Sequence, residues 1–185
     1  MGTSNWQNIS YCVELIRLVK PAKVLDVGVG YGRWGMLCRE FLDVWGGKFF
    51  RSQWTTQIDG IEVFPANVDQ YHQYFYNQIY VGNAYTVIDT LGRYDLIILG
   101  DVLEHFEKTQ ALHFLDKCLY RSSHVLLIIP IGTNWPQGAV YGNEHERHLS
   151  AWSMEELRRF PIAHDRMFKD QAGRSFAVCL FKGWG

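Results

Sequence analysis

Apolar residues recur along the chain with two spacings, which separate helices from strands. Between residues 9 and 19 every third or fourth position is apolar, which predicts an amphipathic helix, and Pro21 ends it. The same spacing over residues 34–44 predicts a second helix. Short apolar runs bounded by turn residues predict buried strands; these are expected at residues 23–27, 56–63, 78–81, 94–99 and 124–131, with further helices at 67–75 and 108–120.

The C-terminal segment breaks this alternation of strand and helix. Residues 163–168 and 174–181 have the composition of strands, and the turn-prone residues 169–173 leave no room for a helix, so an antiparallel hairpin is predicted. Just before it, Ser153 and Glu156 form a capping-box pattern that opens a short helix. The expected fold is α/β: a doubly wound, mostly parallel seven-stranded sheet with an antiparallel C-terminal hairpin strand and helices on both faces.

Length and composition predict a globular protein with one domain. We expect residues 1–185 to form a single domain, with an N-terminal covering helix in residues 1–20. The 48% hydrophobic and 20% charged residues exclude a disordered or fibrous chain. The 18 basic and 19 acidic residues leave a net charge of −1, which disfavours a nucleic-acid partner. We expect a cytoplasmic protein without a membrane partner. The four cysteines are scattered, and the sequence has neither a signal-peptide core nor an apolar run of membrane-spanning length.

The first predicted strand runs directly into a cluster of glycines. Gly28, Gly30 and Gly32 occupy alternate positions, which allows a tight turn whose backbone amides face a ligand. With Asp26 they form the pattern D-x-G-x-G-x-G, but Gly30, Gly32 and Gly35 also satisfy the dinucleotide pattern G-x-G-x-x-G. Asp26 favours the first pattern, because a carboxylate there would repel a pyrophosphate but attract the ammonium group of a zwitterionic sulfonium ligand.

At these residues the chain resembles the class I S-adenosylmethionine-dependent methyltransferases. Their first motif is similar to the run from Val24 to Gly32, and the predicted terminal hairpin matches the antiparallel seventh strand of that family. The resemblance implies S-adenosyl-L-methionine as the cofactor and a methyl acceptor as the substrate.

The resemblance also implies cofactor contacts at the ends of the predicted strands. Glu62 would accept hydrogen bonds from both ribose hydroxyls, and Asp59, earlier in the same strand, is the rival acid. Asn83 would meet the adenine amino group, although an asparagine there also suits a turn. The other implied contacts are the residues of the first motif, one wall of the adenine site and two residues beside the methionine part: Asp26, Gly28, Gly30, Gly32, Ala84, Gly100 and Asp101.

Two segments resemble the O-methyltransferases of this class. The run from Gly100 to Phe106 resembles their D-x-x-E-H-hydrophobic signature, and His148 with Trp152 resembles their H-x-x-x-W segment. The long polar and aromatic segment 132–150 is interpreted as a substrate lid loop. His105 and His148 are the predicted catalytic bases, because imidazole titrates near neutral pH. The expected reaction is O-methylation of a small-molecule acceptor.

Three other interpretations stay open. Asp101, Glu104, His105 and His148 resemble the divalent-metal ligands of small-RNA 3′-terminal 2′-O-methyltransferases, but the chain lacks their basic charge, and no metal is predicted. A non-catalytic module that binds S-adenosylmethionine and an NAD(P)-dependent oxidoreductase are the other two.

Overall fold

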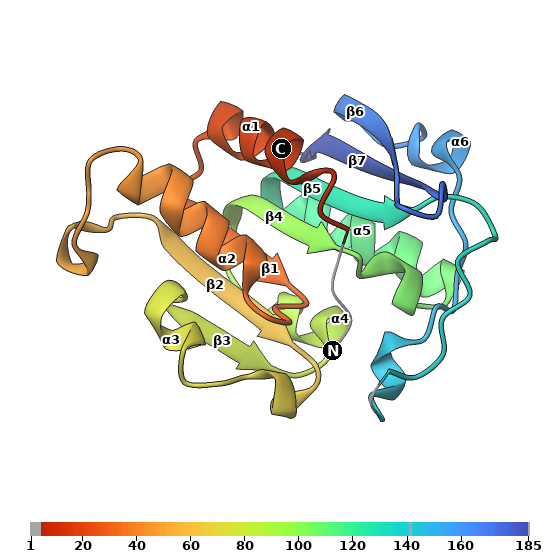
Figure 1. The fold of residues 1–185 in the computed structure, drawn as a ribbon, viewed down its shortest axis with the longest axis horizontal. Helices are drawn as coiled ribbons and strands as arrows, with labels where there is room; N and C mark the ends of the chain where they lie inside the picture. Colours follow the sequence, from red (N-terminus) through yellow and green to blue (C-terminus); the bar gives the residue numbers. More distant parts are fainter. Residues whose placement is uncertain (1–4, 141, 185) are drawn as a thin grey trace.

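The computed structural model describes residues 5–140 and 142–184, and within them seven strands form one sheet (Figure 1). The strand order is β3-β2-β1-β4-β5-β7-β6. The first five strands are parallel, whereas β7 is antiparallel to both of its neighbours. The strands are β1 (Lys23–Val27), β2 (Gln57–Glu62), β3 (Gln78–Val81), β4 (Tyr94–Gly100), β5 (Ser122–Pro130), β6 (Ile162–Lys169) and β7 (Ser175–Lys182). The predicted fold class, including the terminal hairpin, is confirmed.

Helices cover both faces of this sheet. One face carries α1 (Ile9–Val19), α2 (Arg33–Cys38), its π-helical continuation η1 (Arg39–Val44) and α3 (His72–Phe75). The other carries α4 (Ala84–Val87), α5 (Lys108–Arg121) and α6 (Met154–Leu157). Short 3₁₀ turns lie between these elements: η2 (Arg51–Gln53), η3 (Pro65–Asn67), η4 (Ile88–Thr90), η5 (Leu103–His105) and η6 (Glu144–Glu146). No helix of the described residues is both long and apolar enough to cross a membrane.

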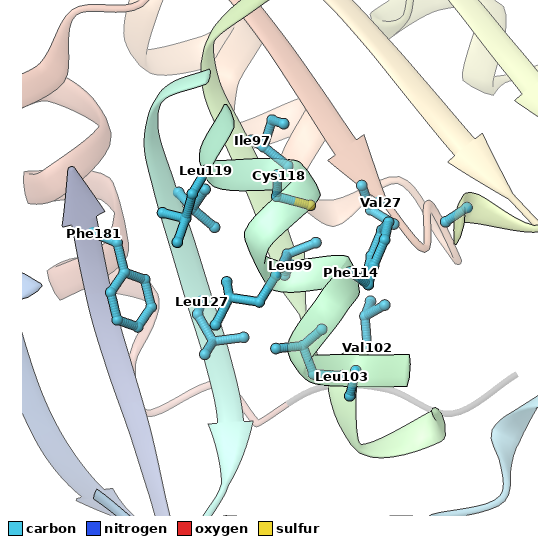
Figure 2. Packing of buried hydrophobic residues seen from close by; sticks show 14 of the residues in the cluster. Val27, Ile97, Leu99, Val102, Leu103, Phe114, Cys118, Leu119, Leu127 and Phe181 are labelled. Carbon is cyan, nitrogen blue, oxygen red and sulfur yellow. The ribbon is translucent and has the colours of Figure 1, made fainter. Parts of the chain in front are cut away.

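The core on the second face forms between α5 and the central strands. Phe114 and Leu119 of α5 are fully buried in the same cluster as Leu99 of β4 and Leu127 of β5 (Figure 2). Because helices cover both faces, the central strands are apolar on both sides and do not alternate with polar residues. This core holds the carboxyl ends of β4 and β5 rigidly in place, where the candidate chemistry lies.

The structure differs from the sequence prediction in one helix. The helix expected at residues 67–75 is reduced to α3, because Val68 is extended and the amide of Asp69 donates to Nδ1 of His72 (3.0 Å) instead of joining a helical ladder. Within the covering segment expected at residues 1–20, α1 matches the helix predicted at residues 9–19, and residues 1–4 lie outside the described residues. The predicted capping box is present: Ser153 and Glu156 each accept a hydrogen bond from the other's backbone amide.

Candidate active site

A cleft of about 270 Å³ opens at the carboxyl ends of β1, β2 and β4. Successive strands are added on one side of β1 up to β3 and on its other side from β4 onward. The cleft lies at this change of direction, which is where open α/β sheets bind ligands. Several predicted residues line it: Gly28, Gly30, Glu62, Asn83, Ala84, Gly100 and His105. Four others are not among its lining residues: Asp26, Gly32, Asp101 and His148.

The loop after β1 needs its glycines for both conformation and space. Gly28, Gly30 and Gly32 have φ angles of 76°, 51° and 77°, a region that favours glycine. A Cβ atom on Gly28 would also lie only 2.9 Å from a methyl group of Val102. Beneath the loop, the buried ring of His72 lies with Nε2 3.0 Å from the carbonyl oxygen of Gly30. The glycine backbone therefore forms part of the cleft wall, beside Val29 and Tyr31 of the same loop.

Asp26 lies behind this loop and is fully buried. Its Oδ2 accepts a 2.5 Å hydrogen bond from the hydroxyl of Tyr76, and that hydroxyl accepts one from the backbone amide of Gly35 (3.2 Å). Burial raises the pKa of Asp26 to about 7; the hydrogen bond from Tyr76 opposes this rise, and the nearby charge of Glu62 adds to it. In this position the carboxyl group fixes the loop against α2.

Glu62 ends β2 with its carboxylate on the cleft, although only 3% of the residue is exposed. Oε2 accepts from the amide of Gly30 and Oε1 from the amide of Phe64, both at 2.9 Å. Each carboxylate oxygen has a second lone pair, so both can still accept a hydrogen bond from a ligand. The rival acid Asp59 is engaged elsewhere: its Oδ2 accepts hydrogen bonds from the Tyr94 hydroxyl (2.9 Å) and the Gln57 amide group (2.6 Å).

Asn83 lines the cleft, and it also caps a helix. Its Oδ1 accepts a hydrogen bond from the amide of Tyr85 (2.9 Å) at the start of α4. The turn role considered from the sequence is therefore present in the structure. Ala84, the next residue, is buried beside it at the cleft wall.

A second cavity of about 190 Å³ lies beside the cleft. Asp101, which follows β4 in a left-handed conformation (φ 55°), lines this cavity. His105 and Glu146 line both the cavity and the cleft. The segment after β5 runs along the carboxyl edge of the sheet (Figure 1) and contributes side chains to both spaces: Asn143, His145 and Glu146 to the cleft, and Trp135, Gln137, Glu146 and His148 to the cavity.

The two predicted catalytic histidines meet in this second cavity. Their ring centroids are 5.1 Å apart. Nδ1 of His105 lies 3.0 Å from the carbonyl oxygen of Arg147, and Nδ1 of His148 lies 2.7 Å from that of Trp135. Because a carbonyl oxygen only accepts, each Nδ1 carries a proton, which leaves Nε2 as the ring nitrogen that can act as a base. Burial lowers the pKa of His148, and electrostatic repulsion from His105 and Arg174 contributes in the same direction.

Glu104 adds an acid to the pair of histidines. Glu104, His105 and His148 each offer one ligand atom, and these atoms lie within 4.8 Å of one another. Both carboxyl oxygens of Glu104 are buried without a hydrogen-bond partner among the described residues. Burial raises its pKa well above the ordinary range, and the neighbouring Asp101 adds to the rise. Two imidazoles and one carboxylate are donors that suit a divalent transition metal, so this cluster fits such an ion.

Comparison with known proteins identifies the family. The family described as Methyltransferase domain matches residues 7–169. The chain belongs to this family. The resemblance predicted from the first motif and the terminal hairpin is thereby confirmed. No curated protein matches the methyltransferase chain significantly.

Solved methyltransferase structures share the fold at low sequence identity. The N-terminal domain of EvdMO1, crystallised with S-adenosylhomocysteine and D-fucose, has a TM-score of 0.66 and 14% identity over 97% of this chain and 84% of its own. Magnesium protoporphyrin IX methyltransferase from Synechocystis PCC 6803, with bound S-adenosylhomocysteine, has a TM-score of 0.65 and 14% identity over 96% and 83%. A Klebsiella pneumoniae protein provisionally described as an O-methyltransferase has a TM-score of 0.61 and 17% identity over 99% and 84%.

The sequence prediction missed two residues of the candidate site. Tyr76 supports Asp26 from 50 residues away, and no motif signals it. Arg174, the residue just before β7, lines the second cavity. The exposed aromatic and polar character of segment 132–150 did signal a site, but could not show which side chains point inward.

The raised pKa of Asp26 predicts how the stability of the methyltransferase domain depends on pH. The folded state holds this proton up to about pH 7, whereas the unfolded chain releases it near its ordinary value of 3.8. Stability should therefore fall as pH rises from about 4 to about 7. Asp26→Asn should remove this part of the dependence, so that the variant gains stability relative to wild type at pH 8 but not at pH 4. Urea unfolding at each pH measures the difference, with Glu14→Gln, at an exposed position of α1, as control. A pH-independent difference would contradict the buried-proton assignment.

Proposed function

We propose that this protein is an S-adenosylmethionine-dependent O-methyltransferase that acts on a small polar acceptor. The observation that carries the proposal is that His105 lines both the 270 Å³ cleft and the 190 Å³ cavity. His105 therefore lies between the cleft that we assign to the methyl donor and the cavity that we assign to the acceptor, where the methyl group would be transferred. Family membership and a neighbour crystallised with S-adenosylhomocysteine and a sugar support this assignment. The four buried free cysteines support the predicted cytoplasmic location.

The cleft has the features needed to bind the donor. The backbone of the Gly28–Gly30 turn allows close approach of the methionine part, and Glu62 accepts from the ribose hydroxyls with its remaining lone pairs. Asn83 and Ala84 form the wall for adenine, with Asn83 Nδ2 as the group not used in capping. Asp26 acts from behind the loop by fixing its position.

The transfer requires alignment more than activation, because the sulfonium methyl group is already reactive. The acceptor hydroxyl oxygen attacks the methyl carbon in line with the sulfur; the O–CH₃ bond forms as the S–CH₃ bond breaks, and S-adenosylhomocysteine leaves. Positioning of this kind lowers a barrier by about 7–11 kcal/mol. The hydroxyl proton passes to Nε2 of His105 or His148, a step worth about 10²- to 10⁴-fold in rate.

Metal-assisted O-methylation is the second candidate, favoured by the clustered Glu104, His105 and His148. A divalent ion held there would lower the pKa of an acceptor hydroxyl. Both histidines already present Nε2, and hydrogen bonds from Nδ1 to carbonyls are the outer contacts that commonly orient metal-binding imidazoles. The RNA form of this candidate has less support, because the adjoining cavity is only about 190 Å³.

Glu62→Gln should weaken binding of S-adenosylmethionine about 10- to 100-fold, because charged hydrogen bonds of this type contribute about 1.5–3 kcal/mol each. Isothermal titration calorimetry with S-adenosylmethionine and S-adenosylhomocysteine measures the change, and thermal unfolding checks that the loop remains folded. Asp59→Asn is the control, since its carboxylate bonds to Tyr94 and Gln57 and should leave affinity unchanged. If Asp59→Asn is the weaker binder, Glu62 is not the acid that binds the ribose. If NAD binds in preference, the assignment of S-adenosylmethionine as cofactor is wrong.

His148→Ala and His105→Ala should reduce methyl transfer by about 10²- to 10⁴-fold while S-adenosylmethionine affinity changes little. Release of S-adenosylhomocysteine with a panel of hydroxylated metabolites measures the transfer. His164→Ala, an exposed histidine on β6, is the control. Full turnover by both variants would remove these histidines from catalysis, whereas cofactor binding without turnover on any acceptor in wild type would favour the non-catalytic module.

Metal content and chelation distinguish the two candidates. In the metal-assisted reaction, Co²⁺ added to purified protein should produce d–d absorption bands that Glu104→Gln and His148→Ala abolish, and EDTA should stop a turnover that added metal restores. In the metal-free reaction, EDTA leaves turnover unchanged and Co²⁺ gives no bands. The absorption spectrum tests the binding site independently of activity.

A further inference from the structure

Arg174 occupies a defined position on the wall of the second cavity. It lines this cavity with His105 and His148, although it lies far from them in the sequence. Its Nε donates to Oδ2 of Asp170 (2.8 Å), and its guanidinium carbon lies 4.0 Å from the ring centroid of Trp135. The side chain is thus held at two points, by a carboxylate and by an aromatic face.

Both supports of Arg174 are themselves anchored to the backbone. Oδ1 of Asp170 accepts from the amides of Ala172 (2.9 Å) and Arg174 (2.7 Å) in the turn between β6 and β7. The indole nitrogen of Trp135 donates to the carbonyl oxygen of Ser175 (3.0 Å). A guanidinium held in this way loses little conformational freedom when it binds a ligand, so it is organised in advance for recognition.

The guanidinium keeps unused donors of a particular geometry. It has five N–H groups, and within the described residues its hydrogen bonds involve Nε alone. The two terminal nitrogens therefore remain, and their planar fork matches the two oxygens of a carboxylate or phosphate. Asp101 and Glu146 also line the cavity, so an anion is placed more favourably against Arg174 than against these carboxylates.

We infer that Arg174 binds an oxyanion group of the methyl acceptor, a carboxylate or a phosphate, while the reacting hydroxyl of the same molecule lies beside His105 and His148. The acceptor is therefore a hydroxylated acid or phosphate ester of about monosaccharide size, since a cavity of 190 Å³ lies below the range of about 300–1,000 Å³ typical of sites for drug-sized ligands. This inference rests on the proposed function and names its substrate class.

Three probes with the same sugar ring test the anion preference. D-Glucose, D-glucuronate and D-glucose 6-phosphate are titrated into protein saturated with S-adenosylhomocysteine, and binding is followed by calorimetry and ligand-detected NMR. At least one anionic sugar should bind about 10-fold or more tightly than glucose, and which of them binds distinguishes carboxylate from phosphate. Arg174→Gln should abolish that preference, whereas Arg158→Gln, an exposed arginine paired with Asp165, should retain it.

The outcomes separate this inference from the proposed function. Equal binding of the three sugars, no binding of either anionic sugar, or an unchanged preference in Arg174→Gln overturns the role of Arg174. With any acceptor that is methylated, Arg174→Gln should raise KM about 10-fold and change kcat less than about 2-fold. If an anion binds through Arg174 but no methyl group is ever transferred, the proposed function fails while the anion site stands.

Discussion

One buried hydrogen bond, from the Tyr76 hydroxyl to Asp26, joins three elements beneath the cleft. Asp26 lies on β1, Tyr76 follows α3, and the amide of Gly35 in α2 completes the chain of contacts. A Cβ atom on Gly35 would lie 2.2 Å from the Tyr76 ring, so the approach requires glycine there. The glycine turn starts at this point, and the position of its backbone, hence of this part of the cleft wall, depends on this contact. Asp26, which does not line the cleft, thus supports from behind the loop that does.

The rest of the site follows from the carboxyl edge of the sheet. The ends of β1, β2 and β4 supply the cleft, the residues that follow β4 supply one wall of the cavity, and the segment after β5 lines both. His105 lies between the two spaces. Helices bury the central strands on both faces, so their ends cannot shift relative to one another without opening the core. Within this frame Glu104 is buried with no hydrogen-bond partner for its carboxyl oxygens among the described residues, and its raised pKa favours the neutral form, which costs less to bury.

The architecture and the cleft could be predicted because their signals are local. Buried parallel strands have continuous apolar runs in the sequence, and Gly28 to Gly32 follow β1 directly, so the position of the cleft could be derived from the strand ends alone. Three features could not be derived in this way. They are the direction of the Asp26 side chain, the shortening of α3 by the His72 side chain and the contact between Trp135 and Arg174. Each depends on a contact between segments, or on a side-chain bond that competes with the backbone, and spacing does not encode these. Asn83 shows a further limit, since capping and ligand contact favour the same residue type.

The carbonyl oxygens that orient the two histidines both belong to the segment after β5. The Arg147 carbonyl sets the tautomer of His105, and the Trp135 carbonyl sets that of His148. The orientation of both imidazole rings therefore depends on one stretch of backbone, and His148 itself belongs to that stretch. A substitution that displaced this segment would release both rings together, so the two histidines are coupled through the chain as well as through their ring contact.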